Sequence, residues 1–398
     1  MLTYQEYLSA RRFPGLDGLR AIAAVLVVGS HFGGWWPVLN GWIGVQMFFV
    51  LSGYVITTLA LREEARDGRM SLANFYLRRA FRILPVYYVV LSMVVVQHVL
   101  RFEYHSNGLD SAMPYYLTFT NEYDPGKVFG QSWTLGVEQK FYLVWPLLAF
   151  GIGVLAFRNR LTLAIVLVAG LLAMAAFQVP YMAAYAMLLI GCLVAILMHD
   201  PRTFALLRPF SHPGVGIVML IAAAALQVSI DNLERYFDDG GLIGVTAFAL
   251  SIALLIPALV NRGPVTWLFS LPVMRFVGER SYSLYLLQGI GTVIVAVTFP
   301  RLAGHATLTV IAVTLVSLAL ADMLYRWVEL PMIDVGRKVV ARRTARIAAR
   351  KTDTEPAEIT PDTPTAPAAP TPAVTPNTVT TPNTVTTVDT VGSEPIKS

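Results

Sequence analysis

Residues 13–36 read FPGLDGLRAIAAVLVVGSHFGGWW, and this stretch decides the fold class. About 20 mainly apolar residues in a helix cross the hydrocarbon core of a bilayer, so the stretch is long enough to span one. It also holds the ionisable residues Asp17, Arg20 and His31. Charged groups inside hydrocarbon are costly and usually mark a function. The stretch therefore predicts a membrane helix that carries a functional site.

The spacing of the ionisable residues places them on one face of the helix. Arg20 and His31 are eleven residues apart, which at about 100° per residue is three turns plus about 20°. At about 1.5 Å per residue, His31 lies roughly 16 Å from Arg20, near the middle of the bilayer. We therefore expect a buried imidazole on the face that also carries an arginine. In the alternative interpretation, Arg20 extends to the interface and His31 only bonds a neighbouring helix.

The composition excludes an ordinary soluble domain. Of the 398 residues, 55% are hydrophobic and 14% are charged, with a mean hydropathy of +0.58, whereas soluble domains carry about 25% charged residues. The net charge of +5 is spread between apolar runs, so we predict no nucleic-acid partner. The single Cys192 provides no thiolate cluster, and the sequence has no His–carboxylate metal motif and no Walker loop. We predict no metal and no permanently bound cofactor.

Apolar windows predict an all-α integral membrane protein with about ten transmembrane helices. The windows are residues 16–36, 42–61, 83–103, 134–156, 161–179, 181–198, 214–230, 241–260, 282–299 and 307–327. If the N-terminus is cytoplasmic, 24 Lys and Arg residues flank the inner ends and four flank the outer ends. Because cytoplasmic loops are enriched in these residues, we expect both termini in the cytoplasm.

Three regions are expected along the chain. Residues 1–335 form the membrane domain, residues 336–351 a basic juxtamembrane segment, and residues 352–398 a Thr/Pro-rich cytoplasmic tail. The tail is too polar to bury a core, so we predict that it is disordered.

The stretch FYLRRAFRILPVYY holds Arg78, Arg79 and Arg82 at the cytoplasmic side of its window. Arg79 and Arg82 are three residues apart, so their two guanidinium groups share a helix face and can bind a phosphate. The alternative is that these arginines anchor the topology or contact anionic lipids.

If Thr134 lies near the outer interface, the stretch QSWTLGVEQKFYLVWP places Glu138 about 6 Å inside the membrane, with Tyr142 one turn further on the same face. We expect Glu138 to come within reach of His31 if their helices pack together. A carboxylate that orients an imidazole forms a general base. The alternative is a structural ion pair of Glu138 with Arg20 or Lys140.

Two more stretches contribute small or polar side chains. GWIGVQMFFVLSGYVITTLALRE contains Gly44, Ser52 and Gly53, which we interpret as helix-packing residues. GERSYSLYLLQ contains Ser281 and Tyr282, which line a pocket or bond neighbouring helices.

Taken together, these stretches resemble the acyltransferase family 3 of integral membrane acyltransferases. The resemblance rests on LDGLRAIAAVLVVGSH with Arg20 and His31, on GWIGVQMFFVLSGY, on FYLRRAFRILP with Arg79 and Arg82, and on SWTLGVEQKFY and SYSLYLL. They occur in the order of the family and extend over most of the first 330 residues.

The resemblance implies a membrane-bound O-acyltransferase. Members of the family move an acyl group, here expected to be acetyl or another short one, from cytoplasmic acyl-CoA to a hydroxyl of an envelope carbohydrate or a glycosylated small molecule. We therefore expect acyl-CoA as co-substrate and a multi-pass location in a bacterial plasma membrane. The alternative from another class is a proton-coupled transporter or flippase of an envelope precursor.

The resemblance also implies roles for single residues. His31 is expected to be the catalytic base or the acyl carrier, with Glu138 and Arg20 as its catalytic partners. The remaining predictions are an acyl-CoA site of Arg78, Arg79 and Arg82 and a pocket lined by Asp17, Ser132, Tyr142, Ser281 and Tyr282.

The chain departs from the family at two points. Gln288 stands where many members have His at the end of the ninth-helix motif, so we expect no proton carrier there. Some members have a hydrolase-like domain after the membrane part, whereas the tail here is Thr/Pro-rich. Any step that relays the acyl group to a final acceptor is therefore expected to need a separate acyl-relaying protein.

Overall fold

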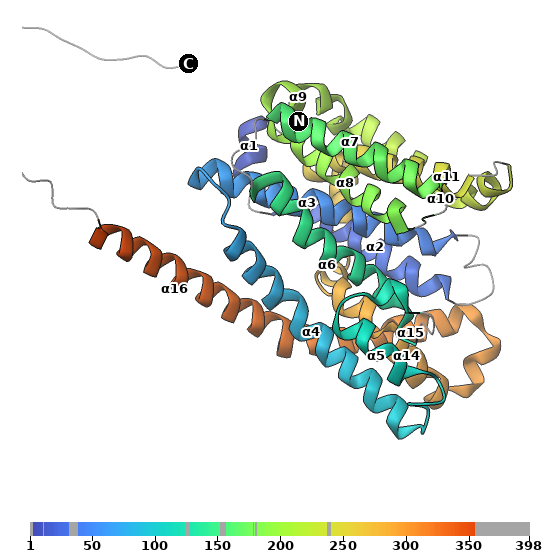
Figure 1. The fold of residues 1–398 in the computed structure, drawn as a ribbon. Helices are drawn as coiled ribbons and strands as arrows, with labels where there is room; N and C mark the ends of the chain where they lie inside the picture. Colours follow the sequence, from blue (N-terminus) through green and yellow to red (C-terminus); the bar gives the residue numbers. More distant parts are fainter. Residues whose placement is uncertain are drawn as a thin grey trace, which may run out of the picture. The chain divides into compact units, whose positions relative to one another are not determined.

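The computed structural model describes residues 3–10, 12–31, 39–124, 128–151, 157–177, 179, 181–236 and 240–354. These residues form helices and connecting loops, with no strand among them (Figure 1). The end of the first predicted window, residues 32–36, and most of the predicted tail, residues 355–398, lie outside the described residues.

The helices have the following bounds in chain order. They are α1 (Tyr4–Ser9), α2 (Pro14–Ser30), η2 (Gly41–Ile43), α3 (Gly44–Asp67), α4 (Leu72–Leu100), α5 (Leu109–Leu117), η3 (Asn121–Tyr123), η4 (Gly130–Ser132), α6 (Trp133–Pro146), the π-helical turn η5 (Leu147–Gly151), α7 (Phe157–Ala176), α8 (Tyr181–His199), α9 (Pro201–Leu207), η6 (Arg208–Ser211), α10 (Pro213–Tyr236), α11 (Gly240–Val260), α12 (Pro264–Phe269), α13 (Pro272–Glu279), α14 (Ser281–Thr298), η7 (Pro300–Gly304), α15 (Ala306–Leu324), the π-helical turn η8 (Tyr325–Glu329) and α16 (Leu330–Thr354).

Within the described part of the chain, eight helices are long and apolar enough to cross a membrane, by length and composition. They coincide with eight of the ten predicted windows. The other two windows fall on α2, which has 17 residues, and on α6, which has 14 residues and continues into the turn η5. The helices agree with an all-α membrane protein, while the number of crossings and the orientation of the termini stay predictions.

Small residues let the central helices α3 and α8 approach closely, as the sequence predicts for the second window. A Cβ added to Gly53 on α3 would lie 1.8 Å from the carbonyl oxygen of Leu188 on α8. A Cβ added to Gly191 on α8 would lie 2.0 Å from the carbonyl oxygen of Val50 on α3. Because neither glycine has a side chain, the backbones of α3 and α8 can touch at both positions.

Close packing also fixes α2 against α12 and α13. A Cβ added to Gly18 on α2 would lie 1.9 Å from the carbonyl oxygen of Phe269, and one added to Gly278 on α13 would lie 1.9 Å from the carbonyl oxygen of Asp17. Because these contacts are between backbones, they set the position of the helix itself. Arg20 lies on this fixed part of α2.

Gly191→Ala is expected to lower the stability of the folded protein by about 1–3 kcal/mol, because the added methyl group overpacks the contact between α3 and α8. The measurement is thermal unfolding of the purified protein in detergent. Gly170→Ala on α7 is the matched control, since no atom lies within 4 Å of its added Cβ. An equal melting temperature for the two variants would contradict this account of the packing.

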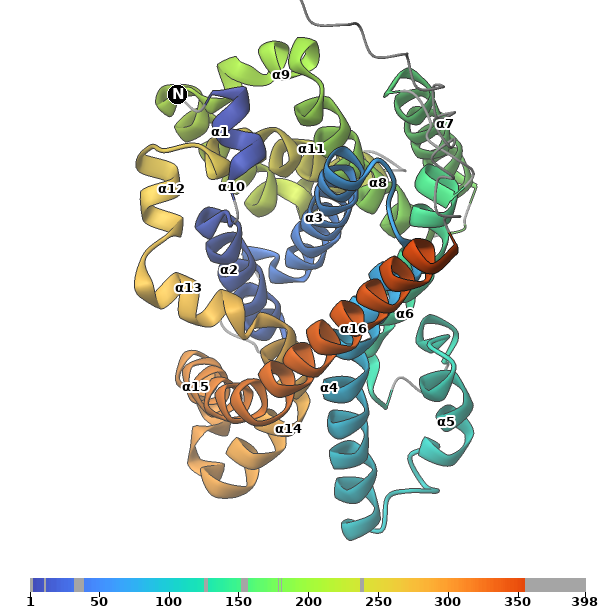
Figure 2. The ribbon, with the colours of Figure 1, turned by 90° about the vertical axis from the view of Figure 1, so that its left-hand side faces the viewer.

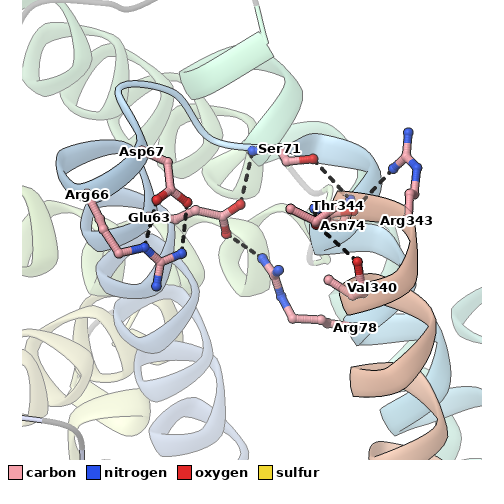
Figure 3. Close-up of polar contacts among 9 residues, drawn as sticks. All are labelled: Glu63, Arg66, Asp67, Ser71, Asn74, Arg78, Val340, Arg343 and Thr344. Atoms are coloured by element: carbon pink, nitrogen blue, oxygen red, sulfur yellow. Dashed lines mark hydrogen bonds and ion pairs between the residues drawn. The ribbon is translucent and has the colours of Figure 1, made fainter. Parts of the chain in front are cut away.

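The helix α16 continues the fold beyond the predicted end of the membrane domain. It runs through the predicted basic segment, and its residues up to Arg346 belong to the compact unit Met1–Arg346. This part of α16 lies alongside the start of α4 (Figures 2 and 3). There Asn74 Nδ2 donates to Thr344 Oγ1 at 3.3 Å, and Arg343 Nη1 donates to Asn74 Oδ1 at 3.3 Å.

Candidate active site

A cavity of about 930 Å³, a volume that includes space open to solvent, lies among α2, α3, α4, α6, α13 and α14. A pocket with apolar walls and a few convergent polar groups is typical of a small-molecule site. Seven of the eleven predicted site residues line this cavity. Its polar lining consists of Arg20, Ser52, Arg79, Arg82, Thr134, Glu138, Tyr142, Glu279, Ser281, Tyr282 and Tyr285.

Two neutral donors hold the carboxylate of Glu138 at the cavity. Oε1 accepts a hydrogen bond from Ser52 Oγ at 2.9 Å, and Oε2 accepts one from the Tyr142 hydroxyl at 2.9 Å. The alternative of an ion pair with Lys140 is wrong, because the Lys140 ammonium pairs with Glu122 instead. A carboxylate bonded to hydroxyl groups and open to a cavity can take up a proton from a nucleophile or return it.

Arg79 and Arg82 on α4 both line the cavity, as their spacing predicts. Arg79 Cζ lies 5.7 Å from the ring centroid of Phe75 and 5.5 Å from that of Tyr142. Aromatic rings on which a guanidinium group stacks fix its plane and leave its N–H edge available to a ligand.

The charged lining has more cations than anions. Arg20 on α2 is a third guanidinium group at the cavity, and the acidic lining residues are Glu138 and Glu279. Asp17, which is predicted to line the pocket, lies beside the lining, with its Oδ1 3.8 Å from Arg20 Nη1. An excess of positive charge suits an anionic ligand.

Arg12 links two acidic residues at the edge of the cavity. Its Nη2 donates to Glu279 Oε1 and lies 3.3 Å from Asp17 Oδ2. Partial burial acts to lower the pKa of Arg12, but the hydrogen bond to Glu279 and the charge of Asp17 outweigh it and raise this pKa above its usual value. Arg12 therefore stays cationic and fixes the position of the Glu279 carboxylate.

His31 lies outside the cavity lining. It is the C-cap residue of α2, its side chain is exposed, and its Nδ1 lies 2.8 Å from the carbonyl oxygen of Val27. The expected buried imidazole is therefore wrong for the described structure, in which the side chain at the end of α2 is exposed. Glu138 bonds hydroxyl groups instead of this imidazole. The catalytic role of His31 stays a prediction.

Arg78 and Ser132 also lie outside the lining. Arg78 pairs with Glu63 near the start of α4, where its side chain is exposed (Figure 3). Ser132 is buried, accepts a hydrogen bond from Asn121 Nδ2 at 2.7 Å and donates to the carbonyl oxygen of Phe129 at 2.6 Å. These bonds connect the Ser132 hydroxyl to the turn before α6.

Four polar lining residues are absent from the predicted site: Ser52, Thr134, Glu279 and Tyr285. Ser52 lies in a window interpreted as packing, yet it donates to Glu138, 86 residues away. Thr134 Oγ1 donates to the Tyr285 hydroxyl at 3.1 Å, across 151 residues. Local spacing could not identify them, because their partners are distant in the sequence.

Comparison with known proteins gives a family match and several relatives. Residues 13–326 match the family described as an acyltransferase domain. The chain is 26% identical over 373 residues to the putative peptidoglycan O-acetyltransferase YrhL of Bacillus subtilis, an alignment covering 85% of this chain and 58% of that protein. It is 26% identical over 369 residues to the peptidoglycan O-acetyltransferase OatA of Listeria monocytogenes, covering 82% of this chain and 57% of that protein. A putative O-acetyltransferase of Staphylococcus aureus is 28% identical over 386 residues, covering 86% and 61%.

The chain thus spans about three fifths of the length of these relatives. No solved structure matches it. The family match includes every residue that lines the cavity.

Proposed function

Since this chain belongs to the acyltransferase family that its residues 13–326 match, we propose that it is a membrane O-acyltransferase. The donor is acyl-CoA, with acetyl-CoA the first to test, and the acceptor is a hydroxyl group of a cell-envelope carbohydrate. The acceptor class follows relatives named as peptidoglycan O-acetyltransferases. We place the reaction at the bacterial plasma membrane.

The observation that carries this proposal is the charge pattern of the cavity. Acyl-CoA is a polyanion, and guanidinium groups such as those of Arg79 and Arg82 bind phosphate oxygens through paired N–H groups. Glu138 supplies a proton acceptor beside them, and among the described residues its hydrogen bonds come from the neutral hydroxyl groups of Ser52 and Tyr142. A donor site and a base in one cavity are the parts that acyl transfer needs.

In the proposed reaction, a hydroxyl group attacks the carbonyl carbon of the acyl-CoA thioester, and Glu138 accepts the proton of this hydroxyl group. The carbonyl oxygen of the thioester becomes negatively charged as the new C–O bond forms, and the Arg20 guanidinium group stabilises this charge. The C–S bond then breaks, and the thiolate of CoA takes the proton from Glu138. The apolar walls of the cavity limit the access of water and with it hydrolysis of the donor.

The test is release of free CoA by the purified full chain in lipid nanodiscs. Acetyl-CoA is supplied with and without peptidoglycan fragments, and mass spectrometry of the fragments detects the added acetyl group. Release that depends on the fragments, together with acetylated fragments, supports the proposal. A protein that is folded and binds acetyl-CoA, yet releases no CoA with any carbohydrate acceptor, would contradict it and favour the transporter alternative.

His31→Ala is expected to leave the Kd for acetyl-CoA unchanged, because His31 lies outside the cavity that we assign to the donor. We expect acceptor-dependent transfer to fall several-fold, since we propose that this imidazole orients the acceptor by a hydrogen bond while Glu138 takes up the proton of its hydroxyl group. Calorimetric binding of acetyl-CoA and CoA release measure the two effects. The control is His105→Ala, an exposed histidine whose bond to Asp110 lowers the pKa of that carboxyl. Transfer at the wild-type rate in His31→Ala would remove His31 from the reaction.

A further inference from the structure

Ser52 on α3 makes an uncommon hydrogen bond for a serine inside a helix. Such hydroxyl groups often bond the carbonyl oxygen four residues earlier on the same helix. Residues that do so in this chain include Ser92, Thr162, Thr292 and Thr344. Ser52 Oγ instead donates to Glu138 Oε1 on α6 at 2.9 Å. Its proton therefore already points at a carboxylate inside the cavity.

The backbone around Ser52 is fixed by helix packing. The next residue, Gly53, lies against the backbone of α8, and Val50 lies against Gly191. Ser52 therefore stands between two points at which α3 and α8 touch. Catalytic groups on such rigid elements are positioned more precisely than groups on loops.

A second serine makes the same bond outside the cavity. Ser283 Oγ donates to Glu329 Oε2 at 3.1 Å, both residues are buried, and neither lines the cavity. Ser52 and Glu138 line the cavity together with Arg20. The cavity thus combines a hydroxyl group, an acceptor for its proton and a cation that can stabilise an oxyanion. These are the parts of nucleophilic catalysis.

We propose that Ser52 is the nucleophile of the reaction and carries the acyl group as an ester between donor and acceptor. The inference rests on the proposed acyltransferase function. Ser52 Oγ attacks the carbonyl carbon of the thioester, so that a C–O bond forms and the C–S bond breaks. The serine proton passes through Glu138 to the leaving thiolate, and CoA departs as the thiol.

The second step regenerates the enzyme. The acceptor hydroxyl attacks the ester carbonyl, and its proton passes through Glu138 to Ser52 Oγ as the bond between Ser52 and the acyl group breaks. The acyl group ends on the acceptor, and the serine is restored. Both steps need only the donor and the acceptor, without a further reactant.

The experiment traps the ester on the full chain in nanodiscs. The protein is mixed with radiolabelled acetyl-CoA without an acceptor, quenched in acid, and separated under denaturing conditions. Peptide mass spectrometry then locates the acetyl group. We expect label on Ser52 that withstands neutral hydroxylamine, is removed at alkaline pH and disappears when peptidoglycan fragments are added.

Three variants test whether the label depends on the Ser52 hydroxyl group. Ser52→Ala is expected to lose the label and at least about 100-fold in transfer rate, as a lost nucleophile would cause. Ser52→Cys keeps the size of the side chain and is expected to carry a thioester that neutral hydroxylamine cleaves. Ser283→Ala, the matched control, is expected to be labelled like the wild type. Thermal unfolding of each variant confirms that it is folded.

The outcomes separate this inference from the proposed function. In one outcome, the wild type acetylates the acceptor but carries no label, and folded Ser52→Ala acts at the wild-type rate. This result overturns the assignment of Ser52 as the nucleophile, while the acyltransferase function stands. If the wild type releases no CoA with any acceptor, both are overturned. A label that remains in Ser52→Ala and maps to another residue also overturns the assignment.

Discussion

Glu138→Gln should lower the kcat for acyl transfer by about 10²–10⁴-fold, the range that a lost general base causes. The amide has the size of the carboxyl group and can still accept a hydrogen bond from Ser52 or Tyr142, but it does not take up the proton of the nucleophile. Acetyl-CoA should bind as tightly as before or more tightly, because the change removes a negative charge from a cationic cavity. Release of CoA gives kcat, and calorimetry gives the Kd.

Glu103→Gln is the control for this substitution. Glu103 lies in the loop after α4, where it pairs with Arg101 at 3.1 Å, and it does not line the cavity. Because exposed pairs of this kind contribute little, both kcat and Kd should match the wild type. A kcat for Glu138→Gln within threefold of the control would exclude Glu138 as the base, and a weakened Kd alone would assign it to binding.

The part of the site that could be predicted is the part that depends on position within one helix. Glu138 and Tyr142 are four residues apart on α6, and their predicted common face is confirmed by the hydrogen bond between them. The predicted common face of Arg79 and Arg82 is also confirmed, because both residues line the cavity from α4. A helix has a fixed angle per residue, so the sequence alone determines which side chains share a face.

The ends of helices could not be predicted in this way. Hydropathy continues through His31 to Trp36 in the sequence, but α2 stops at Ser30, where the Ser30 hydroxyl bonds the carbonyl oxygen of Val27. A window average cannot locate this end, because the apolar character of the chain does not change there. The expected burial of His31 rested on this window, whereas the structure exposes the His31 side chain at the end of α2.

The spacing of residues within one helix also could not predict which residues of different helices contact each other. The sequence places small residues around Ser52 and so favours packing, which Gly53 and Gly191 confirm. That Ser52 itself contacts Glu138 depends on how α3 and α6 meet. Adjacent residues in a helix differ by about 100°, so only the tertiary structure decides whether Arg78 or Arg79 faces the cavity.

Arg79→Ala should raise the KM and the Kd for acetyl-CoA by about 10–100-fold, which corresponds to the loss of roughly 1.5–3 kcal/mol from a hydrogen bond to a charged group. Arg79 lines the cavity and is held over the rings of Phe75 and Tyr142. Arg79→Lys should recover only part of the affinity, because an ammonium group lacks the paired N–H groups and the planar stacking of guanidinium. Calorimetric titration and steady-state CoA release measure the change.

Arg78→Ala provides the sharpest comparison, since it removes the same charge one residue away. Arg78 is exposed, pairs with Glu63 and lies outside the lining, so its loss should change the Kd for acetyl-CoA by less than about threefold. Charge alone would make the two substitutions equivalent, whereas a donor held inside the cavity makes Arg79 far more important. If both variants weaken binding equally, the anionic part of the donor lies at the exposed start of α4, and the cavity is not the site that binds it.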